Sequence, residues 1–145
     1  MKVLLINGSP RKQGNTAIAL AEVAKQLAEN GIESEIVWIG NKPVRGCMAC
    51  NKCKENPGAC IFNDDVCNAI SSKFAQANAL IVGSPVYWGQ PNGAVLAVLQ
   101  RAFYSNGTDH ISRCNRRSWF CDFAVDHHAA TAACFGSDSP AFDDS

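Results

Sequence analysis

The sequence predicts an open parallel α/β sheet, and three observations support that prediction. Two short apolar runs, "VLLI" at 3–6 and "ALIV" at 79–82, are each soon followed by a glycine, a pattern typical of parallel strands that are buried on both faces. Each run leads into a polar loop rich in Gly and Pro. An apolar stripe with helical spacing follows each loop. Because ligands of such sheets bind at the carboxyl ends of the strands, we expect the site to lie in these loops.

The predicted elements follow in the order strand, loop and helix, three times over. The first helix covers about 16–30, where apolar residues recur at i, i+3, i+4 and i+7 and Gly31 provides the stop. A second strand is predicted at 34–39. Asp64 or Asp65 is the expected cap of a second helix, whose inner face would comprise Val66, Ala69, Ile70, Phe74 and Ala77. The third helix has its stripe at Val95, Val98, Leu99 and Ala102.

Composition and charge restrict the class of protein. The chain has 145 residues, 47% of them apolar, which is enough for one domain with a core. Its 13 basic residues are balanced by 13 acidic ones, so we expect no nucleic-acid partner. The apolar run at 3–6 is too short for a signal peptide or a membrane span, and we expect a cytoplasmic protein without a membrane partner. In that reducing compartment, clustered thiols favour metal or redox chemistry over disulfides.

The first loop, "NGSPRKQGNT" at 7–16, has the features of an anion site. It leaves a strand and enters a helix, so free backbone N–H groups and the positive end of the helix dipole converge there. The side chains of Ser9, Arg11, Asn15 and Thr16 add donors and a cation, which suits a phosphate monoester. The glycine spacing matches neither the dinucleotide fingerprint nor the triphosphate loop. A plain turn with a helix cap is the alternative.

The second loop, "GSPVYWGQPNG" at 83–93, places Tyr87 and Trp88 between Pro85 and Gly89. Flat apolar groups on a backbone that can approach a ligand closely suit a flat heteroaromatic ring. The alternative is that the two aromatic residues only cover the sheet edge.

A cysteine cluster lies in the segment 46–60. Cys47, Cys50 and Cys53 are spaced three residues apart and Cys60 follows seven positions later, in the pattern C-x2-C-x2-C-x6-C. Such a compact run can wrap a cubane iron-sulfur cluster. Two alternatives stay open: a structural zinc site, although such sites usually have two separated CxxC pairs, and reduced thiols that only pack. Cys67 is expected to be a packing residue of the second helix.

The pattern of strand, loop and helix stops after residue 107. We therefore predict a domain at 1–107 and an atypical tail at 108–145, which is either a frameshift product or a divergent or disordered terminus. A sheet that lacks its fourth and fifth strands would expose the edge of its third strand.

The three loops in this order resemble those of the flavodoxin-like NAD(P)H-dependent FMN reductases, and within them the iron-sulfur flavoproteins, over residues 1 to about 107. The resemblance implies a doubly wound parallel sheet of order 2-1-3-4-5, incomplete here at the C-terminus. It implies that the first loop holds the FMN phosphate and that the second lines the isoalloxazine; the residues are Ser9, Pro10, Arg11, Gly14, Asn15 and Thr16, then Pro85, Val86, Tyr87, Trp88 and Gly89. It also implies a [4Fe-4S] cluster on Cys47, Cys50, Cys53 and Cys60.

The function implied by the resemblance is that of an oxidoreductase that takes hydride from NAD(P)H to FMN. Electrons would pass to a small-molecule or protein acceptor, with the cluster as a further carrier, in a homodimer or homotetramer. The protein would position and tune the flavin, so no catalytic side chain is predicted. Competing hypotheses are a non-catalytic or truncated chain with structural zinc or free thiols, and an anion-binding module without flavin.

Overall fold

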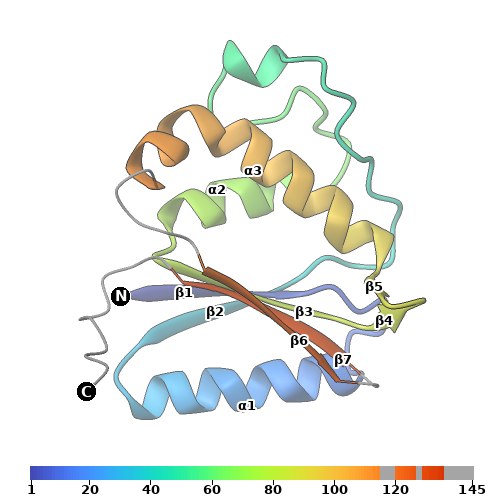
Figure 1. The fold of residues 1–145 in the computed structure, drawn as a ribbon, viewed down its shortest axis with the longest axis vertical. Coiled ribbons are helices and arrows are strands. Elements are labelled where there is room, and N and C mark those ends of the chain that lie inside the picture. The colour runs from blue at the N-terminus through green and yellow to red at the C-terminus, as the bar shows by residue number, and fades with distance from the viewer. Residues whose placement is uncertain (115–119, 127–128, 136–145) are drawn as a thin grey trace.

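The structure is a computed structural model of the chain, and it describes residues 1–114, 120–126 and 129–135. Its main sheet has the order β2-β1-β3-β7-β6 (Figure 1). β1 pairs in parallel with both β2 and β3, as the sequence predicts. The five strands are β1 (Lys2–Asn7), β2 (Glu33–Trp38), β3 (Ala79–Ser84), β6 (Phe120–Asp126) and β7 (Ala129–Phe135).

Helices cover the sheet from both sides. α1 (Asn15–Glu29) lies on one face, and α2 (Cys67–Gln76) and α3 (Gly93–Cys114) lie on the other (Figure 1). Alternate side chains of β1 point to opposite faces: Leu4 and Ile6 pack in the core with Ile70 of α2, whereas Val3 and Leu5 pack with Leu20 of α1. This explains why the strand has a continuous apolar run rather than an alternating one.

The second helix differs in detail from its prediction. Ala69 is exposed, whereas Cys67 and Ser71 are buried, so the buried stripe is rotated by part of a turn from the predicted face. Cys67 packs in the interior, as expected. Asp65 stabilises the start of α2, because its Oδ1 accepts a hydrogen bond of 2.9 Å from the Cys67 amide.

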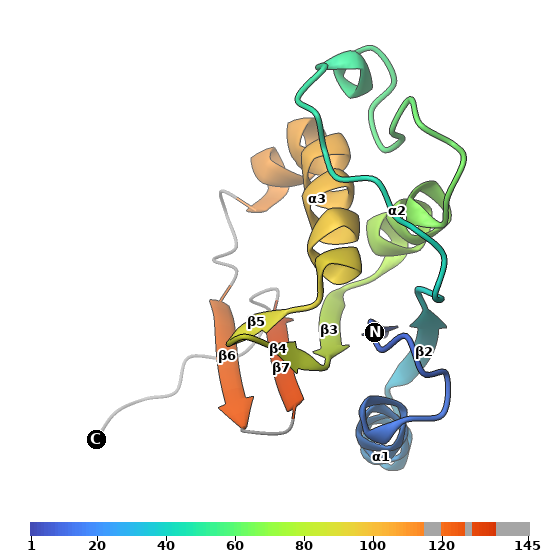
Figure 2. The same ribbon diagram turned by 90° about the vertical axis from the view of Figure 1, so that its right-hand side faces the viewer.

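The three loops occupy two separate places. The loop after β1 and the loop after β3 both lie at the carboxyl ends of the parallel strands. The second contains the small hairpin of β4 (Val86–Tyr87) and β5 (Gln90–Pro91). The cysteine loop leaves β2 and extends over α2 and α3, where the short helix η1 (Lys52–Lys54) lies on the side away from the sheet (Figure 2). Among the described helices, none has the length and apolar character needed to cross a bilayer.

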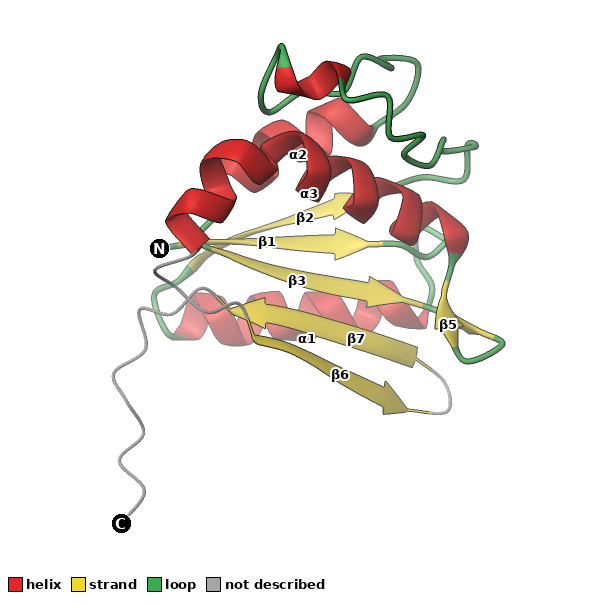
Figure 3. Ribbon diagram, turned by 45° about the horizontal axis from the view of Figure 1, so that its top comes forward, coloured by secondary structure: helices red, strands yellow, loops and turns green. Residues whose placement is uncertain are grey.

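The C-terminal elements differ from the expectation drawn from the sequence. α3 continues to Cys114, and β7 pairs antiparallel with β3, so the edge of β3 that we expected to be exposed is covered (Figure 3). β6 pairs antiparallel with β7, because only two residues separate these strands and such a short connection permits a hairpin but no parallel crossover. The fourth and fifth parallel strands are thus replaced by an antiparallel pair. Residues 115–119, 127–128 and 136–145 of the predicted tail lie outside the described residues.

Candidate functional site

The two loops at the carboxyl ends of the strands are fastened to each other. The Gly8 amide donates to the Gly83 carbonyl at 2.8 Å, and the Asn92 side-chain amide donates to the Gly8 carbonyl. The Asn92 backbone amide donates to Ser84 Oγ at 3.0 Å, while its Oδ1 accepts from the Val95 amide at 2.9 Å and so caps α3. Asn92 therefore links both loops to the start of a helix, and sequence reasoning did not select it.

The first loop has buried polar atoms beneath an exposed rim. Ser9 is buried: its amide donates to Asn7 Oδ1 at 3.0 Å, its Oγ accepts from the Arg11 amide at 3.2 Å, and its carbonyl accepts from Trp38 Nε1 at 2.7 Å. Thr16 is buried as well. Pro10, Arg11 and Asn15 are exposed, and Gly14 is partly buried.

Helix α1 begins next to this rim. No side chain caps its N-terminus at Gly14. The Ala17 and Ile18 amides donate to the Gly14 carbonyl at 2.9 and 3.2 Å, which leaves the Asn15 and Thr16 amides to bind an acceptor from outside the helix. A Cβ at Gly14 would lie 3.3 Å from Arg11 Cβ and 3.5 Å from Ser9 Oγ, which shows how tightly the loop turns. The arrangement of free amides, a buried hydroxyl and the exposed Arg11 cation is suited to an anion.

The second loop presents its aromatic residues to solvent. Trp88 and Gly89 form the tip of the β4–β5 hairpin with φ of +52° and +73°, as a two-residue type I′ turn requires. The Trp88 side chain is fully exposed and that of Tyr87 is about half exposed, at 52%. Pro85 and Val86 are partly buried at the base of the hairpin. Trp88 therefore covers no part of the sheet edge in the described structure, and the predicted contact of this loop with a ligand stays a prediction.

The four cysteines of the loop face a common pocket. Cys47, Cys50, Cys53 and Cys60 line it together with Ile61, Phe62, Arg101 and Tyr104. Burial raises the pKa of the Cys53 thiol, and the charges of the Cys47, Cys60 and Cys50 thiolates raise it further. Nevertheless, no group of three or more His, Cys, Asp or Glu side chains within the described ranges is arranged to hold a metal ion. The fold thus gathers the thiols without a formed metal site, and their predicted role as ligands stays a prediction.

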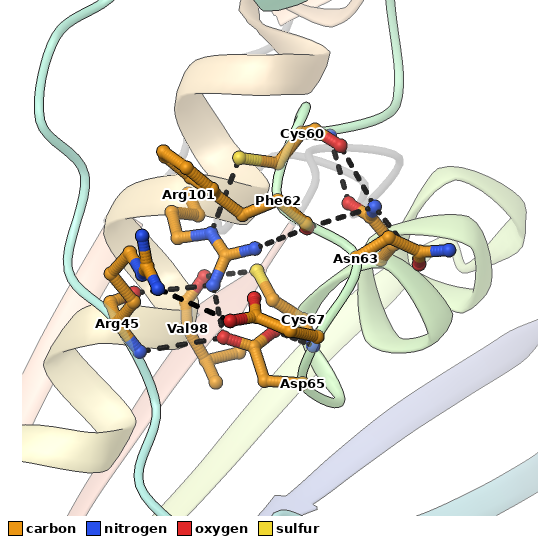
Figure 4. Close-up of polar contacts among 10 residues, drawn as sticks. Arg45, Cys60, Phe62, Asn63, Asp65, Cys67, Val98 and Arg101 are labelled. Carbon is orange, nitrogen blue, oxygen red and sulfur yellow. Dashed lines mark hydrogen bonds and ion pairs between the residues drawn. The ribbon is translucent and has the colours of Figure 1, made fainter.

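Arg101 of α3 is the centre of the contacts around this pocket, and its side chain is fully buried (Figure 4). Its Nε donates to Cys60 Sγ at 3.3 Å, and its Nη2 donates to the Phe62 carbonyl at 2.7 Å. Its Nη1 donates to the Arg45 carbonyl at 3.2 Å and forms an ion pair with Asp65. One guanidinium thus binds both ends of the cysteine loop and the residue Asp65 at the start of α2.

Arg101 and Asp65 form a charged buried pair. Burial alone would raise the pKa of Asp65, but hydrogen bonds from the Cys67 amide and the Arg101 guanidinium outweigh it, so the pKa is lowered. Burial alone would lower the pKa of Arg101, but the hydrogen bonds to Asp65 and Cys60 raise it. Sequence reasoning missed Arg101; a charged residue on the apolar stripe with Val98 and Ala102 was the available signal.

Cys60 is the most firmly held of the four cysteines. Its amide donates to Asn68 Oδ1 at 2.8 Å, and its carbonyl accepts from Asn68 Nδ2 at 2.8 Å. The preceding turn is fixed at Gly58, whose amide donates to the Ser105 carbonyl at 2.8 Å and whose carbonyl accepts from Ser71 Oγ at 2.9 Å. Cys47 and Cys50, by contrast, are exposed. The pocket therefore has one fixed thiol and a more exposed segment that carries the other three.

The fold and the loops define a flavodoxin-like α/β protein that carries an additional cysteine loop. The chain belongs to the NADPH-dependent FMN reductase family, whose family profile matches residues 1–120.

Known relatives include several iron-sulfur flavoproteins. The chain is 40% identical over 102 residues to one from Methanocaldococcus jannaschii. The aligned segment covers 70% of this chain and 52% of that relative. It is 33% identical over 102 residues to one from Archaeoglobus fulgidus and to one from Methanosarcina thermophila, covering 70% of this chain and 49% and 52% of those relatives. The chain thus spans about half the length of these relatives. No solved structure matches the chain.

Proposed function

We propose that this chain is the flavin-binding part of an FMN-dependent oxidoreductase that accepts hydride from NAD(P)H. The observation that supports this proposal most directly is the junction of the first and second loops at the carboxyl ends of β1 and β3. Asn92 holds these loops together; α1 begins at the end of the first loop, and Trp88 lies at the tip of the hairpin in the second. In open α/β sheets, that position is where ligands bind.

Each part of the proposed site suits one part of FMN. The free amides at the start of α1, the Ser9 hydroxyl and the Arg11 cation would bind and neutralise the phosphate. Tyr87 and Trp88 would contact the isoalloxazine, and Pro85, Val86 and Gly89 would shape the backbone beside it. Bound FMN would supply the two-electron chemistry, while the protein would position the ring and exclude water from it.

The cysteine pocket is proposed as the site of a [4Fe-4S] cluster, which would supply one-electron transfer when bound. The relatives' name, iron-sulfur flavoprotein, supports this proposal, as does the placement of all four cysteines around one pocket. Cys60 would be the preformed ligand, and the segment with Cys47, Cys50 and Cys53 would close toward it. The electron acceptor would be a small molecule or a protein.

An absorption spectrum of protein purified without oxygen tests the proposal. It is recorded before and after dithionite, with FMN, iron, sulfide and zinc assayed on the same sample. Flavin bands above a broad shoulder that bleaches on reduction are expected. Flavin without iron and sulfide would show an FMN reductase without a cluster. Zinc in place of iron and sulfide would show that the cysteines form a structural zinc site. A colourless protein that takes up no added FMN would contradict the proposed function.

A further inference from the structure

Among the described residues that line the cysteine pocket, Arg101 is the one buried cation. Its hydrogen bonds fix the direction in which its guanidinium points. The Arg101 guanidinium directs its Nε–H toward Cys60 Sγ at 3.3 Å, while Nη1 faces the carboxylate of Asp65. The Arg101 side chain is 0% exposed and the Asp65 side chain is 7% exposed, so water screens neither charge effectively. The pair therefore presents its positive end to the pocket and its negative end to the start of α2 (Figure 4).

Further hydrogen bonds fix the position of the Arg101 guanidinium. Its remaining donors bind the carbonyls of Arg45 and Phe62, which flank the cysteine loop on its two sides. Lysine could not replace it, because a single ammonium group cannot serve these divergent acceptors in one plane. No buried side-chain nitrogen or oxygen atom among the described residues lacks a hydrogen-bond partner.

We propose that Arg101 is a positioning residue that holds Cys60 as a ligand and raises the reduction potential of the cluster bound in this pocket. Reduction adds one electron and hence one negative charge to a cluster held by four thiolates. A fixed guanidinium that donates to one of the sulfurs stabilises the reduced form more than the oxidised form. Asp65 acts in the opposite sense, because its carboxylate offsets part of the charge of Arg101. The inference rests on the proposed cluster.

Arg101 and Asp65 should shift the reduction potential in opposite directions, so three substitutions test the proposal. Arg101→Gln removes the charge and the donor geometry, so it should lower the one-electron potential and the iron content. We expect the equilibrium to shift by about tenfold, which is about 59 mV for a one-electron couple. Arg101→Lys keeps the charge but not the donor geometry, and it should lower the potential less. Asp65→Asn keeps an acceptor for the Cys67 amide but removes the opposing charge, and it should raise the potential.

Arg45→Gln is the matched control. Its guanidinium is exposed and paired with Asp64 at 3.2 Å, so the same change of charge should shift the potential much less. The potentials are measured by titration with dithionite and redox mediators on anaerobically purified protein, and iron and sulfide are assayed for each variant.

The outcomes separate this inference from the proposed function. A wild-type protein that contains FMN but no iron or sulfide would overturn the cluster and this inference with it, while leaving the flavin site standing. A wild-type cluster whose potential is the same in Arg101→Gln, Arg101→Lys and Asp65→Asn would overturn this inference alone. If Arg101→Gln does not fold or loads no cluster, Asp65→Asn decides: a raised potential supports the proposal, and an unchanged or lowered one contradicts it.

Discussion

Gly8 lies where a helix and two loops approach most closely. A Cβ built at Gly8 would lie 1.9 Å from Val95 Cγ2 and 3.1 Å from the Gly83 carbonyl oxygen. Neither neighbour can easily move, since Val95 is fully buried and Gly83 belongs to a central strand. The absence of a side chain at Gly8 thus permits the first loop, the second loop and α3 to meet.

Gly8→Ala should therefore destabilise the protein by about 1 to 3 kcal/mol through overpacking. Gly93→Ala is the matched control, because a Cβ there meets nothing within 4 Å and the backbone φ is not positive. It should leave the free energy of unfolding unchanged or raise it by up to about 1 kcal/mol. Urea denaturation compares the two variants with wild type. Equal stability of Gly8→Ala and Gly93→Ala would show that the contact at Val95 relaxes freely.

The buried thiol of Cys67 should make stability depend on pH. Burial raises the pKa of Cys67 from 9.0 to about 11. Between these values the thiol ionises in the unfolded chain but not in the folded one, so the folded state binds more protons and the free energy of unfolding falls as pH rises. The loss should reach about 2 kcal/mol by pH 11.

Cys67→Ala isolates this effect, because the variant retains every other group that titrates in the same range. Urea unfolding at pH 8 and pH 10.5 should show a smaller drop for the variant than for wild type. Parallel drops in the two proteins would mean that Cys67 does not titrate differently on folding.

At the scale of elements, the β4–β5 hairpin combines an exposed aromatic residue with a strained backbone. Trp88 has a left-handed φ of +52°, which is costly for a residue other than Gly, Asn or Asp. Nothing in the described structure packs on its fully exposed ring. A fully exposed aromatic residue in a strained conformation contributes little to folding, which agrees with a role in binding.

Trp88→Asn should separate folding from binding in this hairpin. Asn-Gly is the preferred pair for a type I′ turn, so the variant should be more stable by about 1 kcal/mol. Loss of the ring should weaken FMN binding by about 0.5 to 1.5 kcal/mol, or about two- to tenfold in Kd. Trp88→Phe keeps an aromatic ring and the strain, and it should retain most of the affinity without the gain in stability. Urea denaturation and quenching of flavin fluorescence measure the two effects. Unchanged FMN affinity in Trp88→Asn would contradict the proposed role of the second loop.

The central strands and the loops that follow them could be predicted from the sequence, whereas Arg101, β6 and β7 could not. Runs such as "VLLI" and "ALIV" need burial on both faces, so they identify central strands, and the parallel order then places the first and second loops together. Arg101 could not be identified in this way, because its partners Cys60 and Asp65 lie 41 and 36 positions away and no spacing encodes them. β6 and β7 were missed because Asp122 interrupts "FCDFAVD", and because "AATAACF" consists mainly of alanine, which is depleted in strands and has none of the Val, Ile and Leu side chains of the parallel strands.

For the whole molecule, the structure separates the junction at the carboxyl ends of the strands from the cysteine pocket. Gly8, Gly83 and Asn92 hold the junction together beside the sheet. The cysteine pocket is held instead by Arg101, Asn68 and Ser71, which lie on α2 and α3. The layer formed by these two helices lies between η1 and the sheet (Figure 2). A ligand of one site should therefore leave the backbone of the other largely unchanged.

Amide hydrogen exchange followed by mass spectrometry tests this separation. Without ligand, β1 and β3 should exchange most slowly, since nearly all their residues are buried, and β2 should exchange faster because it lies at the sheet edge and is only partly buried. Added FMN should slow exchange in the first and second loops, at 7–16 and 83–93, and leave the segment 46–60 unaffected. Anaerobic reconstitution with iron and sulfide should slow exchange in 46–60 and leave the first and second loops unaffected. Protection of 46–60 by FMN alone would show that the two sites are coupled through the layer of α2 and α3, and equal exchange in β1 and β2 would contradict the assignment of β2 as the edge strand.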